Sequence, residues 1–186
     1  MCRWNSRKGA GMGFGNIAAM AEKELQPHLP NMIPKLYRFT FDPNPKVGEV
    51  NFAFNSQSMK SIWRSLVRDS KKSVDLYYHT IMADLVKGLG DRMWRTRESS
   101  CNAIHDLISG RSIGELEPYL EQLWIMHFRA LDDIKESVRK SALVTLKTLS
   151  NMTIRYCDPT VVSVSDGQKV INIVCPLLLV NMFLNV

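Results

Sequence analysis

Closely spaced cysteines are missing from this sequence. Its 186 residues include four cysteines, which lie far apart along the chain at Cys2, Cys101, Cys157 and Cys175. Disulfide-rich domains and zinc ribbons need cysteines at short, recurring spacings. The sequence therefore predicts neither framework, and a reducing, intracellular setting is the simpler interpretation.

Concentrated charge is missing as well. Lys and Arg number 24 against 18 Asp and Glu, which gives a formal net charge of +6, and no block of five or six basic residues occurs. A modest positive balance allows binding to acidic partners without requiring it. The charge alone therefore does not predict nucleic acid as a partner.

The sequence has no clear signal for entering or crossing a membrane. Residues 1–15 contain Arg, Lys and several Gly in place of the apolar run of a secretory signal. Residues 170–186 are strongly apolar, but they are fewer than the roughly 20 residues that span a bilayer, and polar residues interrupt them. We expect no membrane span, and instead a helix of the protein core whose neighbour lies outside the given sequence.

Motifs for catalysis and for cofactor binding are also absent. The glycine-rich residues 9–15 have neither the G-x-G-x-x-G nor the G-K-[ST] pattern, and none of the four histidines lies in H-E-x-x-H. Cys101 and His105, four positions apart, could form a nucleophile and a base, but nothing nearby activates the thiol or supplies an oxyanion site. The sequence therefore predicts no enzyme, small-molecule substrate, cofactor or metal site. A cysteine-dependent enzyme is the weakest of the alternatives.

One helical pattern occurs twice, 42 positions apart. TRESSCNAIHDL begins at Thr96 and VRKSALVTLKTL begins at Val138. The matched positions are Arg97 with Arg139, Ser99 with Ser141, Ser100 with Ala142, Ile104 with Leu146, and Leu107 with Leu149. Weaker copies begin at Ser6, which places Arg7 at the arginine position, and at Ser58. A repeat of this length decides the fold class.

The repeated helix has small residues on one stripe and large aliphatic residues on the following turns. Small residues let a neighbouring helix approach closely, while Ile104 and Leu107 fill the groove between helices. We expect Leu146 and Leu149 to face the core in the same way.

An aspartate precedes the arginine in both clear copies, Asp91 before Arg97 and Asp133 before Arg139. A carboxylate at this position can accept the free N–H groups of a helix start. We expect the arginines to form a ladder between adjacent repeats. Two residue pairs have the spacing of a capping box, Asp133 with Glu136 and Ser112 with Glu115.

A second kind of helix lies between the copies, with leucines at steps of three and four. Examples are Leu25, Leu29, Met32 and Leu36; Val74, Tyr77, Ile81, Leu85 and Leu89; and Leu116, Leu120, Leu123, His127 and Leu131. Alternation of the two kinds predicts an all-α fold, an α-solenoid of about eight helices in HEAT-like antiparallel pairs.

We expect the chain to be one array that is truncated at both ends. The predicted parts are the second helix of a preceding repeat (1–22), repeats at 23–69, 73–109 and 114–157, and the first helix of a following repeat (167–186). Residues 47–56 and 161–166 break the period, as surface insertions or as artefacts of gene-model translation. Strand-like signals are limited to Gly48–Phe54 and Val161–Val164.

The segment RMWRTR is the densest cluster of basic and aromatic residues. In one interpretation Trp94 is a core residue and Arg92 and Arg95 are solvated. In the other, Arg92, Trp94 and Arg95 form a partner-binding edge, since Trp and Arg are common interface anchors. Both interpretations stay open at this point.

Several segments resemble one specific family of HEAT-repeat proteins. The segments DLVKGLGDRMWRTRESSCNAIHDLISGR and DDIKESVRKSALVTLKTLSNMTIRYCDP are similar to the large adaptor and scaffold family of the 26S proteasome. The resemblance implies an interior fragment of a longer, non-enzymatic protein that binds proteasome subunits and supports or checks the association of core and regulatory particles. It also implies a cytoplasmic and nuclear location, with links to endosomes or the ER. The alternative, motivated by the net charge and by RMWRTR, is a HEAT-repeat protein of nuclear transport or of nucleic-acid complexes.

Overall fold

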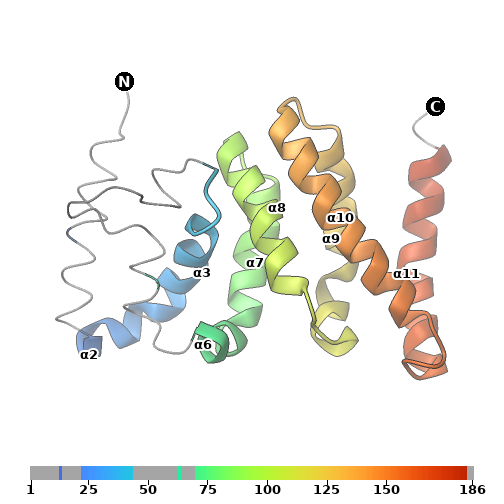
Figure 1. Cartoon of the computed structure of the whole chain (residues 1–186), viewed down its shortest axis with the longest axis horizontal. Helices are drawn as coiled ribbons and strands as arrows, with labels where there is room; N and C mark the ends of the chain where they lie inside the picture. The colour runs from blue at the N-terminus through green and yellow to red at the C-terminus, as the bar shows by residue number, and fades with distance from the viewer. Residues whose placement is uncertain (1–12, 14–21, 44–62, 64–69, 184–186) are drawn as a thin grey trace. The chain divides into compact units, whose positions relative to one another are not determined.

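The structure, a computed structural model, describes residue 13, residues 22–43, residue 63 and residues 70–183. Every regular element within these residues is helical (Figure 1), which confirms the predicted all-α class. Arg7, the irregular segment 47–56 and the strand-like signal at Gly48–Phe54 lie outside the described residues. The predicted total of helices and the repeat boundaries therefore stay predictions. The chain divides into two compact units, residues 1–85 and 86–186.

From residue 22 to residue 39, the first unit consists of three short consecutive helices. These are α2 (Glu22–Leu25), the 3-10 helix η1 (Gln26–His28) and α3 (Leu29–Phe39). The buried stripe of α3 consists of Leu29, Ile33, Pro34, Leu36 and Tyr37. The ring of Tyr37 packs against Trp63, with the ring centroids 5.6 Å apart. An ion pair of 3.3 Å joins Arg38 to Asp84.

The leucine-periodic segment after residue 70 forms two helices instead of one. Helix α6 (Ser70–Leu76) and helix α7 (Tyr78–Leu89) are separated by a single turn residue, Tyr77. The backbone still bonds across this break, because the N–H of Tyr77 donates to Ser73 (3.0 Å) and that of Ile81 donates to Tyr77 (2.9 Å). The backbone hydrogen bonds therefore continue from α6 into α7. The side chains of the leucine-periodic segment are buried in α7 and not in α6.

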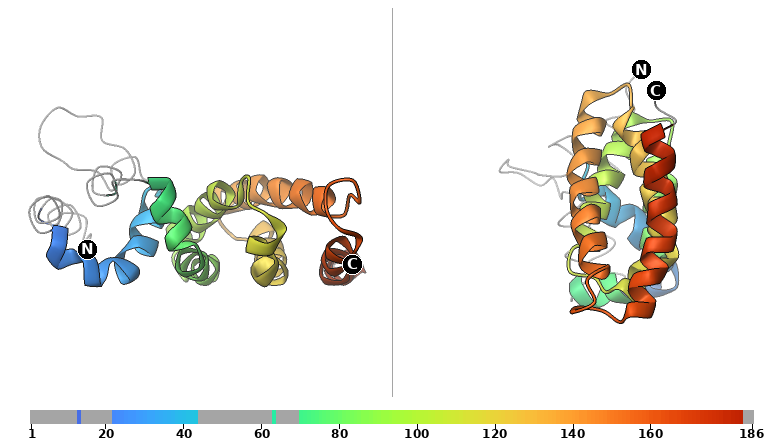
Figure 2. Two further views of the ribbon diagram at one scale, coloured as in Figure 1. Left: turned by 90° about the horizontal axis from the view of Figure 1, so that it is seen from below. Right: turned by 90° about the vertical axis from the view of Figure 1, so that its right-hand side faces the viewer.

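The second unit contains α8 (Trp94–Ile108), α9 (Ile113–Leu131), α10 (Glu136–Tyr156) and α11 (Val164–Phe183). Helix α10 packs on α8 and on α9, and α11 packs mainly on α9. The four helices therefore form two rows, α8 with α10 and α9 with α11, as Figures 1 and 2 show. Stacked helix pairs of this kind confirm the predicted solenoid packing in this unit.

The core of the second unit follows the repeated pattern at most of its matched positions. Ser100 and Ala142 are both fully buried, and Leu107 and Leu149 are also buried. Ile104 is fully buried, but its counterpart Leu146 is only half-buried. The expectation that Leu146 faces the core as Ile104 does was therefore wrong in degree.

One turn leads into the start of α9, and another leads into the start of α11. Gly110, with a φ of +78°, ends the turn after α8, a backbone conformation that favours glycine. The carboxylate of Glu115 then accepts the backbone N–H of Ser112 at 3.0 Å and its hydroxyl at 2.8 Å, as expected of this capping pair. Before α11, residues 161–163 form a turn and the helix starts at Val164, so the strand-like signal at Val161–Val164 does not produce a strand in this described segment.

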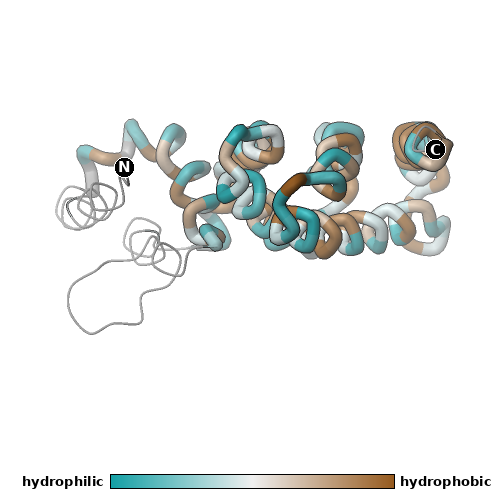
Figure 3. The backbone as a smooth tube through the Cα atoms, turned by 90° about the horizontal axis from the view of Figure 1, so that it is seen from above, coloured by the Kyte–Doolittle hydropathy of each residue, from teal (hydrophilic) through white to brown (hydrophobic). Residues whose placement is uncertain are grey.

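The C-terminal half of α11 exposes a group of large apolar side chains. They are Leu178, Leu179, Val180, Met182 and Phe183, and Figure 3 shows the apolar colour along this helix. Its buried side is formed by Gly167, Val170 and Val174. A side chain at Gly167 would lie 3.2 Å from the carbonyl oxygen of Tyr156, so glycine allows α11 to approach the end of α10. None of the helices in the described residues combines the length and the apolar character that a membrane span requires.

Candidate functional site

The turn before α8 is fixed by Asp91 and Arg97. The Asp91 carboxylate accepts the backbone N–H of Met93 at 2.7 Å. The Nη1 atom of Arg97 donates back to the carbonyl oxygens of Asp91 (2.8 Å) and Arg92 (3.1 Å). The arginine thus satisfies carbonyls of the turn that leads into its own helix.

The turn before α10 has the same set of bonds. Asp133 accepts the N–H of Lys135 at 2.8 Å, and Nη1 of Arg139 donates to the carbonyl oxygens of Asp133 (2.7 Å) and Ile134 (3.1 Å). Each atom pair lies 42 positions after its counterpart before α8. The sequence repeat is therefore a repeat of hydrogen-bond geometry as well as of side-chain type.

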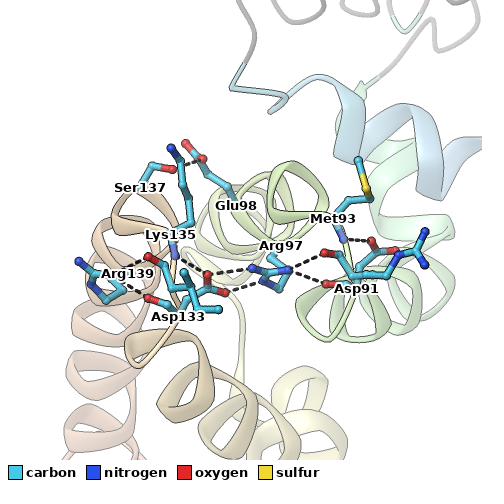
Figure 4. A network of polar contacts seen from close by, with 10 residues as sticks. Asp91, Met93, Arg97, Glu98, Asp133, Lys135, Ser137 and Arg139 are labelled. Atoms are coloured by element: carbon cyan, nitrogen blue, oxygen red, sulfur yellow. Dashed lines mark hydrogen bonds and ion pairs between the residues drawn. The ribbon is translucent and has the colours of Figure 1, made fainter. Parts of the chain in front are cut away.

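Arg97 also joins the two turns. Its Nη2 donates to Oδ1 of Asp133 at 2.8 Å, and its Nε donates to the other carboxylate oxygen, so the pair is bidentate (Figure 4). The side chains are largely shielded, with 19% of Arg97 and 7% of Asp133 exposed. The hydrogen bonds to Arg97 lower the pKa of Asp133, and the bond to Asp133 raises the pKa of Arg97. The contact has the geometry of the link between repeats that was expected of Arg97. The same role for Arg139 stays a prediction.

The predicted capping box of Asp133 with Glu136 does not form. The residue at the helix boundary is Lys135, and the carboxylate of Asp133 is occupied by its N–H and by Arg97. Glu136 instead pairs with Lys140 at 2.8 Å along the exposed side of α10. The Asp133 carboxylate pairs with Arg97 in place of forming a capping box, because two parallel bonds to a guanidinium are stronger than bonds to neutral N–H groups.

Three further contacts extend the junction along α8 and α10. The hydroxyl of Ser137 donates to Glu98 (2.6 Å), and the hydroxyl of Thr145 donates to the carbonyl oxygen of Cys101 (2.9 Å). The Oγ1 atom of Thr148 lies 3.0 Å from Nδ1 of His105. Polar contacts at regular intervals fix the register of the two helices, which apolar packing alone would leave freer.

The basic-aromatic cluster lies at the same edge, at the start of α8. Trp94 is half-buried, and its ring contacts two cations, the guanidinium of Arg95 at 5.3 Å and the ammonium of Lys135 at 4.9 Å from the ring centroid. Arg92 is exposed, and its backbone rather than its side chain belongs to the turn. Arg92 and Arg95 are exposed, as the first interpretation of RMWRTR expects, and Trp94 is only partly in the core. The partner-binding interpretation stays a prediction.

Two exposed residues of this edge were not found from the sequence. Lys135 comes from the turn before α10, and only the folded junction brings it to Trp94. Ile134 is 99% exposed, although the turn that holds it is fixed by Asp133 and Arg139. The one signal in the sequence was the 42-residue repeat, in which Lys135 matches Met93 and Ile134 matches Arg92.

The thiol proposed as a nucleophile is not suited to chemistry. Cys101 is completely buried, and desolvation raises its pKa to about 12. A reactive cysteine needs an accessible thiolate near neutral pH. The contacts of His105 and Thr148 further show that this histidine belongs to the helix junction. The burial of Cys101 therefore argues against a nucleophile and base formed by Cys101 and His105.

His127 is a second buried titratable group of this unit. Its Nδ1 lies 2.7 Å from the carbonyl oxygen of Leu123, and desolvation lowers its pKa to about 4. No group of His, Cys, Asp and Glu residues that could hold a metal ion occurs in the part of the chain that the structure describes. His127 is therefore a neutral core residue.

Comparison with known proteins places the chain beside a set of proteasome proteins. It is 47% identical over 176 residues to the human protein named proteasome adapter and scaffold protein ECM29, which covers 95% of this chain and 9% of the human protein. It is 34% identical to the proteasome component ECM29 of Saccharomyces cerevisiae, over 83% of this chain and 8% of the yeast protein. It is 31% identical to the Drosophila melanogaster protein named proteasome-associated protein ECM29 homolog, over 81% of this chain and 9% of that protein. No protein-family model and no solved structure matches. The chain thus spans about a tenth of the length of these relatives, and the resemblance found in the sequence is confirmed.

Proposed function

Because this chain is related over nearly its whole length to a segment of the ECM29 proteasome-scaffold family, we propose that it acts as a non-enzymatic scaffold segment that binds the 26S proteasome. The observation that carries the proposal is the 47% identity to a human protein named as a proteasome adapter and scaffold. The geometry agrees with such a role, since two rows of helices offer a long protein surface. In the whole protein we propose support or checking of the association of core and regulatory particles, in the cytoplasm and nucleus and at endosomes or the ER.

The edge formed by Arg92, Trp94, Arg95 and Lys135 is the part of this chain that we propose contacts the proteasome. A half-buried tryptophan between two cations provides both apolar area and charge, which are the properties of interface anchors. The turns below it are fixed by Arg97 and Asp133, so little conformational freedom is lost on binding. These two features favour this edge over the rest of the described surface.

Binding of the tagged 186-residue chain to purified 26S proteasomes tests the function. We expect retention of proteasome particles at low salt, and weaker retention by the double variant Arg95→Glu with Lys135→Glu. The matched control is Arg129→Glu, an exposed cation on the side of α9 opposite its buried stripe. Absence of binding by the unchanged chain would overturn the function. Equal binding by the double variant and the control would overturn only the assignment of this edge.

The alternative of nuclear transport or nucleic-acid binding is not favoured, because the relatives are named as proteasome proteins. It predicts binding to RNA or DNA that weakens steeply with salt. A flat or absent salt response of the chain with a mixed-sequence duplex would remove this alternative.

A further inference from the structure

The acidic side chains of the turns before α8 and α10 are used for bonds within the chain (Figure 4). The carboxylate of Asp91 accepts a backbone N–H of its own turn at 2.7 Å. The carboxylate of Asp133 accepts a backbone N–H at 2.8 Å and also binds the guanidinium of Arg97. Asp132, which follows α9, is the one exposed acid of the two turns whose carboxylate has no bond among the described residues. The turns therefore offer little free negative charge.

The acids in the first turns of α8 and α10 are also bonded within the chain. Glu98 accepts the hydroxyl of Ser137 at 2.6 Å, and Glu136 pairs with Lys140 at 2.8 Å. The bond to Lys140 is the main cause of the lowered pKa of Glu136, to which the charge of Lys135 contributes less. Neither acid forms an ion pair with a cation of the neighbouring turns in the part of the chain that the structure describes.

The exposed cations at the same place form no ion pair with a carboxylate among the described residues. They are Arg92 and Arg95, next to Trp94, and Lys135 from the turn before α10. Arg95 and Lys135 contact the ring of Trp94, 5.3 and 4.9 Å from its centroid. An aromatic ring leaves the N–H groups of a cation free to donate to a carboxylate. The edge therefore presents three cations against the single free acid Asp132.

Ile134 adds an apolar side chain at the tip of this edge. It is 99% exposed, more than any other large apolar residue that the structure describes. Its turn is fixed, because its carbonyl oxygen accepts a bond from Arg139 at 3.1 Å and Asp133 accepts the N–H of Lys135. The turn thus holds the side chain away from the chain's own surface. A side chain that is exposed on all sides is removed from water only when a hollow in a partner encloses it.

We propose that this edge binds an acidic protein surface with an apolar hollow that receives Ile134. Carboxylates around the hollow pair with Arg92, Arg95 and Lys135. Like charges keep basic surfaces away, so the edge selects its partner by charge as well as by shape. This partner chemistry rests on the proposed function, because it describes the proteasome surface that the edge is proposed to contact.

Replacing Lys135 by a neutral and by an acidic residue tests the charge of the partner. Binding of the tagged 186-residue chain to purified 26S proteasomes is measured by biolayer interferometry at rising salt. We expect Lys135→Gln to weaken binding about threefold and Lys135→Glu about tenfold, because the first removes attraction and the second adds repulsion. Salt should weaken binding of the unchanged chain more than that of Lys135→Glu. The same two substitutions at the exposed Arg129 of α9 are the control and should change nothing.

Replacing Ile134 by a polar residue tests the hollow. We expect Ile134→Ser to weaken binding about tenfold, because the side chain no longer fills the hollow. The matched control is Ile154→Ser, since Ile154 is 66% exposed at the opposite end of α10. Circular dichroism verifies that every variant is folded. Equal binding of Lys135→Gln and Lys135→Glu would overturn the acidic partner, and unchanged binding of Ile134→Ser would overturn the hollow.

The remaining outcomes separate this inference from the proposed function. Failure of the unchanged chain to bind proteasomes would overturn the proposed function together with this partner. Binding that none of the Lys135 and Ile134 variants changes would overturn the inference alone. Binding of a mixed-sequence RNA, or self-association of the chain, that is lost in Lys135→Glu would identify a different occupant of the edge and would also overturn it.

Discussion

The guanidinium of Arg97 at the start of α8 donates to both carboxylate oxygens of Asp133, 36 positions further along the chain. The same guanidinium bonds two carbonyls of its own turn. One side chain therefore fixes a local turn and the junction with the next helix pair together. Among the residues that the structure describes, Arg139 has the first of these roles without the second, so the two arginines can be compared within one chain.

Arg97→Ala should destabilise the chain more than Arg139→Ala. Removing Arg97 breaks a shielded bidentate pair and leaves Asp133 without its cation, at a cost of about 1.5–3 kcal/mol in the free energy of unfolding. Removing Arg139 breaks only bonds to carbonyl oxygens, at about 1 kcal/mol. Urea unfolding followed by circular dichroism measures both, and the double variant Arg97→Ala with Asp133→Asn tests the coupling. Equal costs for the two arginines would contradict the proposed difference.

His127 should make the stability of the chain depend on pH. Its pKa falls from 6.5 to about 4 on burial. Below pH 6.5, His127 therefore binds a proton in the unfolded chain but stays neutral in the folded chain. The contribution of neutral His127 to the free energy of unfolding is therefore fully present above pH 6.5. It is lost as pH falls toward 4, which lowers the free energy of unfolding by up to about 3 kcal/mol. His127→Leu should flatten the curve of unfolding free energy between these pH values. An unchanged slope in His127→Leu would assign the pH dependence to other groups.

Cys101 should be inert in the folded chain. Its burial and its raised pKa of about 12 leave almost no accessible thiolate at pH 8. The exposed Cys175 provides an internal control. Brief iodoacetamide labelling and peptide mass spectrometry should find Cys175 modified and Cys101 modified only after denaturation. Labelling of Cys101 as fast as Cys175 in the folded chain would reopen the case for a reactive thiol.

Ile104→Ala should cost more than Leu146→Ala, although the two residues match in the repeat. Ile104 is completely buried, so its truncation leaves a cavity and should cost about 2–5 kcal/mol. Leu146 is half-buried, and water can enter the space that its side chain leaves. Thermal unfolding compares them under one condition. A larger loss of stability for Leu146→Ala than for Ile104→Ala would contradict the half-buried position of Leu146 on α10.

The sequence allowed much of the junction between helix pairs to be predicted. The spacing of Asp91 from Arg97 and of Asp133 from Arg139 indicated the repeat and the helix starts, because these contacts are short in sequence or recur at a fixed period. The capping pair of Ser112 and Glu115 was confirmed for the same reason. Where a distant partner competed, as Arg97 does for Asp133, the local rule was wrong and the expected capping box did not form.

By itself, the sequence determined the helical class of this chain, the 42-residue repeat and the aspartate–arginine pairs, since hydrophobic periodicity and local backbone bonding depend on near neighbours. Only the tertiary structure decided which cations face Trp94, how deeply Leu146 lies, and that Arg97 pairs with Asp133. Those properties depend on which helix lies beside which, and the packing of helices that are distant in sequence is not set by any one of them alone.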